Sequence, residues 1–172
     1  MKKALIVIDM QVDFLTGSLA NKEGVEAIPN VIAEIASFSG DVYATLDTHK
    51  EDYLSTNEGH YLPVVHCVKG TKGHEIEAEV GEALKQHPHF RGYLEKPTFG
   101  FLGWKDILPD DIEEIELIGV CTDICVLSNA AILKAQFPNA KITCKGSCCA
   151  GVTPKLHEAA LQVLSSIQVE VI

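Results

Sequence analysis

The segment GVCTDICV, residues 119–126, holds two cysteines four positions apart. An apolar run precedes it and a helical pattern follows it, so Cys125 should lie where a strand turns into a helix. A thiol there is close to the free N–H groups at the positive end of the helix, and a nearby cation can lower its pKa further. The segment therefore suggests a cysteine nucleophile. A cysteine packed in the core fits the local pattern equally well.

Two more ionisable residues are candidates for the same chemistry. Asp9 follows the apolar run at residues 4–8, and a carboxylate in such a place is unfavourable unless it is paired or used. Lys96 precedes Pro97, which biases it toward an extended conformation. Taken alone, Lys96 is typical of a surface lysine, so its role depends on what the fold places beside it.

A possible metal site can be assembled from two segments. Asp47 and His49 alternate in an extended stretch, so their side chains point to the same side. With His66 they could offer one carboxylate and two imidazoles, a set that suits Zn²⁺, Mn²⁺ or Fe²⁺. Glu58 and His60 lie in the connecting loop and could add a fourth ligand.

Length and composition restrict the classes of protein that fit. The chain has 172 residues, 47% of them hydrophobic and 22% charged, which predicts one globular domain over residues 1–172. The formal net charge of −10 disfavours nucleic acids and anionic membranes as partners. The chain shows no export signal and no membrane-length apolar segment, so we expect a cytoplasmic protein. Its six cysteines include no CxxC pair, and we expect free thiols rather than disulfides.

The order of the expected elements predicts the fold class. Strands are expected at residues 4–8, 42–46, 63–68, 115–120, 140–144 and 169–172, and helices at 28–38, 77–87, 125–137 and from Thr153-Pro154 onward. This alternation predicts a single-domain three-layer α/β/α fold with a mostly parallel sheet. Ligands in such folds bind at the carboxyl edge of the sheet. Asp9, Asp47, His66 and Cys125 should meet there.

Five segments together resemble the isochorismatase-like cysteine hydrolase superfamily, and within it the nicotinamidase/pyrazinamidase group. They are IVIDMQVDF (6–14), TLDTHKEDY (45–53), HCVKGTKGHE (66–75), KPTFGF (96–101) and GVCTDICV (119–126). Each segment alone could match by chance, but all five in this order are highly specific. The resemblance implies an isochorismatase-like hydrolase fold and a soluble amide hydrolase.

The resemblance also implies roles for particular residues. The catalytic triad falls on Asp9, Lys96 and Cys125, and the backbone N–H groups of Cys121 and Cys125 would form the oxyanion hole. A cis peptide is implied at Val120–Cys121. The metal ligands fall on Asp47, His49 and His66, with Glu58 as the best match for the fourth and His60 as the second choice.

The implied reaction is hydrolysis of nicotinamide to nicotinate and ammonia through a thioester, with one divalent metal ion (Zn, Mn or Fe) as cofactor. One departure affects the substrate: the group usually has an aromatic residue three positions before the last metal histidine, and here that residue is Pro63. Ring contacts would then come from Phe14, Phe99, Phe101 or Trp104. A metal-free hydrolase of another small amide or ureido compound is the alternative, and a non-catalytic metal or redox sensor is a more remote one. A homo-oligomer is compatible with either enzyme.

Overall fold

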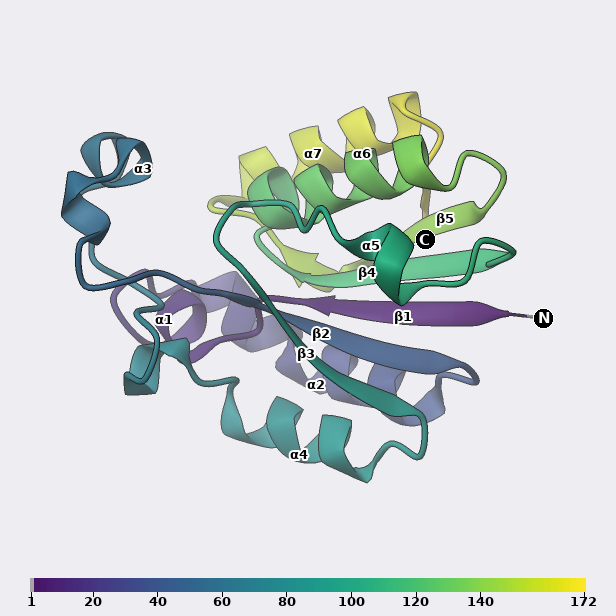
Figure 1. The fold of residues 1–172 in the computed structure, drawn as a ribbon, viewed down its shortest axis with the longest axis horizontal. Helices are drawn as coiled ribbons and strands as arrows, with labels where there is room; N and C mark the ends of the chain where they lie inside the picture. The colour runs from purple at the N-terminus through teal and green to yellow at the C-terminus, as the bar shows by residue number, and fades with distance from the viewer. Residues whose placement is uncertain (1) are drawn as a thin grey trace.

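In the computed structural model, which describes residues 2–172, six parallel strands form one sheet in the order β3-β2-β1-β4-β5-β6. Figure 1 shows the strands from β3 to β5 in this arrangement. The strands are β1 (Lys3–Ile8), β2 (Asp41–Asp47), β3 (Phe90–Lys96), β4 (Glu114–Val120), β5 (Lys141–Ala150) and β6 (Glu170–Val171). The order reverses between β1 and β4. Such a reversal opens a crevice at the carboxyl ends of the two strands, where α/β proteins bind their ligands.

Helices cover both faces of the sheet (Figure 1). One face carries α1 (Val12–Leu15), α2 (Lys22–Ser37) and α4 (Ala78–Gln86), and the other carries α5 (Trp104–Ile107), α6 (Leu127–Gln136) and α7 (Pro154–Ser166). A short helix, α3 (Asn57–Tyr61), projects from the rest of the molecule (Figure 1). Short turns of other helical types are found at Tyr53–Ser55, Lys72–His74 and Thr122–Val126. None of the helices within residues 2–172 combines the length and apolar character that a membrane span requires.

The core explains why the first strand is continuously apolar. Ile6 and Ile8 pack into the layer that holds α6, whereas Leu5 and Val7 pack into the layer that holds α2. All four side chains are fully buried. A central strand with helices on both faces has no solvent side, so apolar residues occupy every position. The predicted three-layer fold class is confirmed.

The prediction of a strand at residues 63–68 is wrong. This segment does not join the sheet, and β3, where the sequence predicts only an extended conformation at Lys96, lies beside β2 instead. The backbone of the 63–68 segment lies beside the continuation of β2: His49 N donates to Cys67 O at 3.0 Å, and Lys69 N donates to His49 O at 3.0 Å. It is also held from α1, where Asp13 Oδ2 accepts from Cys67 N at 2.8 Å. Its apolar residues suggested a buried strand, but Val65 is 45% exposed.

Candidate active site

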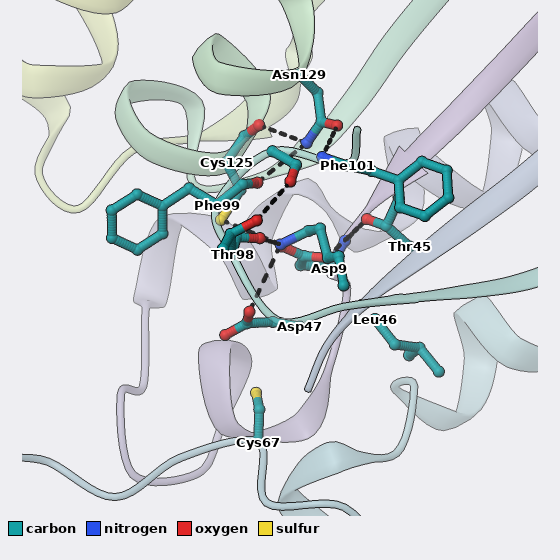
Figure 2. Close-up of polar contacts among 12 residues, drawn as sticks. Asp9, Thr45, Leu46, Asp47, Cys67, Thr98, Phe99, Phe101, Cys125 and Asn129 are labelled. Carbon is teal, nitrogen blue, oxygen red and sulfur yellow. Dashed lines mark hydrogen bonds and ion pairs between the residues drawn. The ribbon is translucent and has the colours of Figure 1, made fainter. Parts of the chain in front are cut away.

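Three ionisable side chains meet at the carboxyl edge of the sheet, beside the crevice between β1 and β4. Figure 2 shows two of them, Asp9 and Cys125. Lys96 Nζ lies 2.6 Å from Asp9 Oδ2 and 3.6 Å from Cys125 Sγ. The side chains of Asp9 and Lys96 are fully buried, and Cys125 is 5% exposed. The ends of β1, β3 and β4 thus supply a carboxylate, an ammonium and a thiol to a single point.

Neighbouring groups fix the carboxylate and the ammonium. Thr45 Oγ1 donates to Asp9 Oδ1 at 2.6 Å and accepts from Asp9 N at 3.2 Å. Asp9 has φ 46°, a left-handed conformation that is uncommon for a residue other than glycine and often found at functional sites. Lys96 Nζ also donates to Thr98 O at 3.2 Å. Both side chains are therefore held in place before any ligand arrives.

The pKa of the Cys125 thiol differs from the expectation. Burial, and then the neighbouring Asp9 carboxylate, raise the pKa of Cys125, and Lys96 only partly opposes them. Burial also raises the pKa of Asp9, against the effect of Lys96. Although burial disfavours its charge, Lys96 has a raised pKa because Asp9, Cys125 and Asp47 surround it. The expected low thiol pKa is thus not found: the resting site pairs a protonated thiol with a charged lysine, so attack by sulfur requires a base.

The turn that carries Cys125 has the backbone form that the resemblance implied. The peptide between Val120 and Cys121 is cis, and residues Thr122–Val126 form a π-helical turn. The Cys121 carbonyl accepts hydrogen bonds from Ile124 N and Val126 N, both at 3.1 Å. All six cysteines are free, as expected.

A second group of side chains could hold a divalent cation. The ligand atoms of Asp47, His49, Glu58 and His66 all lie within 4.8 Å of one another. Asp47 Oδ2 is 3.0 Å from His49 Nε2 and 3.5 Å from His66 Nε2, and Glu58 Oε1 is 3.6 and 3.7 Å from the same two nitrogens. His60, the other candidate, is exposed on α3 and is not part of this group.

The surroundings of this group fit a metal site. His66 Nδ1 lies 2.8 Å from the Val64 carbonyl oxygen, which can only accept, so the proton resides on Nδ1 and the Nε2 lone pair faces the other ligands. The Tyr53 ring packs edge-on against His49 and His66, with centroids 4.7 and 4.9 Å apart. Oriented imidazoles beside two carboxylates suit Zn²⁺, Mn²⁺ or Fe²⁺.

Both groups open into one cavity of about 700 Å³. Its wall includes Cys121 and Cys125 from the nucleophile turn, the metal-binding candidates Asp47, Glu58 and His66, and the aromatic residues Phe14 and Phe99. The wall is mainly apolar elsewhere, and includes Leu19, Ile124, Leu62 and Val152. The cavity thus offers apolar surface next to a thiol and a metal-binding group.

Two of the four aromatic residues expected to contact the substrate lie elsewhere. Phe101 and Trp104 do not line the cavity but pack edge-on against each other, with centroids 4.9 Å apart. Trp104 is fully buried in the core, and its Nε1 donates to Asn129 Oδ1 at 3.1 Å. The expectation for these two residues is corrected, because Trp104 is buried against Asn129 of α6 and Phe101 packs on the Trp104 ring instead of the cavity wall.

The sequence analysis missed residues that support the site. Gln11 holds Asp47 by its backbone, since Gln11 Nε2 donates to Asp47 O at 2.9 Å and Asp47 N donates to Gln11 Oε1 at 2.8 Å. Thr45 and Asn129 were also missed. For two of them the spacing was a usable signal: Thr45 lies two positions before Asp47 on an extended segment, and Asn129 lies one helical turn after Cys125.

The chain is similar to known proteins over nearly its whole length. Residues 3–172 match the Isochorismatase domain family. The chain is 34% identical over 142 residues to the uncharacterized isochorismatase family protein PncA of Bacillus subtilis (strain 168), which covers 76% of this chain and 77% of that protein. The crystal structure of nicotinamidase/pyrazinamidase PncA from Bacillus subtilis has a TM-score of 0.87 at 28% identity, covering 99% of both chains. The pyrazinamidase of Pyrococcus horikoshii in complex with zinc has a TM-score of 0.83 at 26% identity, covering 100% of this chain and 99% of that one.

Proposed function

The chain belongs to the isochorismatase family, and on this premise we propose that it is a metal-dependent nicotinamidase, which hydrolyses nicotinamide to nicotinate and ammonia. The similarity to a solved nicotinamidase/pyrazinamidase supports the substrate. Further support comes from the cluster of Asp9, Lys96 and Cys125 beside one cavity, with a metal-binding group on the same wall.

The observation that carries the proposal is the contact between the catalytic cluster and the metal-binding group. Lys96 Nζ lies 3.6 Å from Asp47 Oδ1, so the ammonium that faces the thiol also faces a candidate metal ligand. A small amide bound at the metal-binding group would therefore have its carboxamide near Cys125. This favours the metal-dependent reaction over the metal-free alternative.

In the first half of the proposed reaction, Asp9 takes the proton of the Cys125 thiol and the sulfur attacks the carboxamide carbon. The C=O electron pair moves to oxygen, and the backbone N–H groups of Cys121 and Cys125 hold the resulting oxyanion. Among the turn, loop and cap hydrogen bonds of residues 2–172, none uses the Cys121 N–H, which supports this role. Asp9 then protonates the nitrogen, the C–N bond breaks and ammonia leaves behind a thioester.

In the second half, Asp9 takes a proton from a water molecule that attacks the thioester carbon. The C–S bond breaks, nicotinate leaves, and the proton returns to the sulfur of Cys125. Lys96 remains charged throughout, because Asp9 and Asp47 both lie within 4 Å of its Nζ. Its role in this scheme is to stabilise the thiolate and to hold the Cys125 thiol and the Asp9 carboxylate close to each other.

The residues fit a divalent metal, which Asp47, His49, Glu58 and His66 would hold. A bound cation would supply a Lewis acid that anchors the ring nitrogen of the substrate. The aromatic residue that usually precedes the last metal histidine is absent, since Pro63 stands there. Phe14 and Phe99, which line the cavity, are proposed to contact the ring in its place.

We further propose that residues 1–172 act as a single domain, because strands from both ends of the chain, β1 and β6, belong to one sheet. The decisive experiment measures ammonia release from nicotinamide by the purified protein, by the Cys125→Ala variant, and after chelation followed by metal return. We expect turnover only with both Cys125 and a metal. Turnover that survives chelation would favour the metal-free alternative, and turnover by Cys125→Ala would contradict the proposed nucleophile.

A further inference from the structure

Asn129 on α6 is the polar residue that joins the nucleophile turn to the loop at residues 97–103 (Figure 2). It is fully buried. Its Nδ2 donates to Cys125 O at 2.8 Å and to Phe99 O at 3.2 Å. Its Oδ1 accepts from Phe101 N at 2.9 Å and from Trp104 Nε1 at 3.1 Å. A carboxamide has two donor hydrogens and two acceptor lone pairs, and here all four are used.

The 97–103 loop connects two parts of the site. It begins directly after Lys96, whose Nζ donates to Thr98 O, and it carries Phe99 on the cavity wall. The loop also lies very close to α6: a Cβ on Gly100 would approach Ile132 Cδ1 to 2.3 Å, so a larger residue there would displace the end of the Ile132 side chain. The position of this loop therefore affects both the lysine that faces the thiol and the ring that faces the substrate.

We propose that Asn129 is a positioning residue that fixes the 97–103 loop against the nucleophile turn, and so sets Lys96 and Phe99 relative to Cys125. The inference rests on the proposed function, because it assigns meaning to the distance between Lys96 and Cys125. Asn129 Nδ2 bridges the backbone carbonyls of Cys125 and Phe99. A displacement of the nucleophile turn or of the 97–103 loop would therefore stretch the same pair of hydrogen bonds. A buried network in which every polar group is satisfied is rigid and specific.

The chemistry of the side chain explains why asparagine is suited to this position. An aspartate would accept from Phe101 N but, when ionised, would place a charged oxygen against two carbonyl oxygens. An apolar residue would leave a buried donor and a buried acceptor of the loop backbone without partners. A displacement of reacting groups by about 1 Å can reduce a rate by about 10²-fold.

The test compares three variants of the metal-loaded enzyme. Asn129→Ala should lower kcat/KM for nicotinamide by about 100-fold, measured at a temperature where circular dichroism shows a folded protein with its metal content unchanged. Gln136→Ala is the matched control, since Gln136 Nε2 donates to Leu102 O at 3.0 Å and holds the same loop to the same helix away from the site. Its turnover should stay within about twofold of wild type. Equal turnover for the two alanine variants would overturn the proposal.

The third variant, Asn129→Asp, gives a readout that a purely structural role would not produce. The new carboxyl can donate to Cys125 O only when protonated, and burial should raise its pKa. Its activity as a fraction of wild-type activity should therefore rise as the pH falls from about 8 to about 5.5. A fraction that does not change with pH would overturn the proposal, even if Asn129→Ala fails to fold. Absence of ammonia release from nicotinamide by the metal-loaded wild-type enzyme would instead refute the proposed function, and is distinguishable from these outcomes.

Discussion

Glu116 on β4 should destabilise the folded protein at neutral and alkaline pH. Burial, and then the neighbouring Glu34 carboxylate, raise the pKa of Glu116 from its ordinary value of 4.5 to about 7, and Lys145 only partly opposes them. One oxygen of Glu116 is buried without a hydrogen-bond partner. The neutral form is therefore favoured in the folded protein, whereas the unfolded chain releases its proton near pH 4.5.

The direction of the effect follows from proton binding. Between pH 4.5 and about 7 the folded state binds more protons than the unfolded state, so the free energy of unfolding falls as the pH rises through this window. One pKa unit corresponds to about 1.4 kcal/mol, so the full shift of the Glu116 pKa would lower the free energy of unfolding by about 3 kcal/mol. Glu116 is only half-buried, so water screens its charge and we expect about 1 kcal/mol.

The substitution Glu116→Gln removes the ionisation and keeps the shape. It should raise the midpoint of thermal unfolding by about 2–4 °C at pH 8, and by less than about 1 °C at pH 4.5. Glu113 is an exposed neighbour, so Glu113→Gln is the control. It should leave the midpoint of thermal unfolding unchanged at both pH values. Calorimetry at several pH values measures the difference. A gain of equal size at both pH values, or no gain at pH 8, would refute the reasoning.

Three further predictions concern the site. Asp9→Asn should reduce turnover of nicotinamide by about 10²–10⁴-fold, because the protonated thiol loses its base, while the folded state persists in circular dichroism; near wild-type turnover would exclude Asp9 from the triad. His49→Ala should abolish both metal binding, measured by elemental analysis, and turnover, whereas His60→Ala should leave both unchanged. Metal retention by His49→Ala would contradict the ligand set. Iodoacetamide near neutral pH should modify Cys125 before the other cysteines, as mass spectrometry would show, because Cys125 lines the cavity and Asp9 beside it can take the thiol proton. The reaction should be slower in Lys96→Met, because the thiolate that forms loses its neighbouring charge; preferential labelling of another cysteine would count against the nucleophile.

The position of the site was predictable because it depends on local patterns. A fully apolar strand followed by a carboxylate indicated Asp9 at the edge of a central strand, and β1 ends one residue before it. Alternation along an extended segment placed Asp47 and His49 on one side, and their side chains are 3.0 Å apart. These features survive in the structure because burial and backbone geometry dictate them within a few residues.

Partners distant in the chain were decided only by the tertiary structure. Hydrophobic periodicity indicates that a segment is buried, but not which segment lies beside it. The sequence therefore predicts a strand at residues 63–68, a segment that does not join the sheet, and does not predict β3, which pairs with β2. The same limit applied to Phe101 and Trp104, whose side of the loop depends on where α6 lies.

The charges of the site also depend on contacts that no single segment reveals. The local sequence around Cys125 suggested a lowered thiol pKa because it showed the start of a helix. The structure adds burial and the Asp9 carboxylate, which together outweigh Lys96 and raise the pKa. The sequence by itself thus placed Asp9, Asp47 and Cys125 at the edge of the sheet, whereas the position of Lys96 depended on the fold. Their protonation was decided by the tertiary structure, because electrostatic energies depend on the distance and burial of every neighbouring charge.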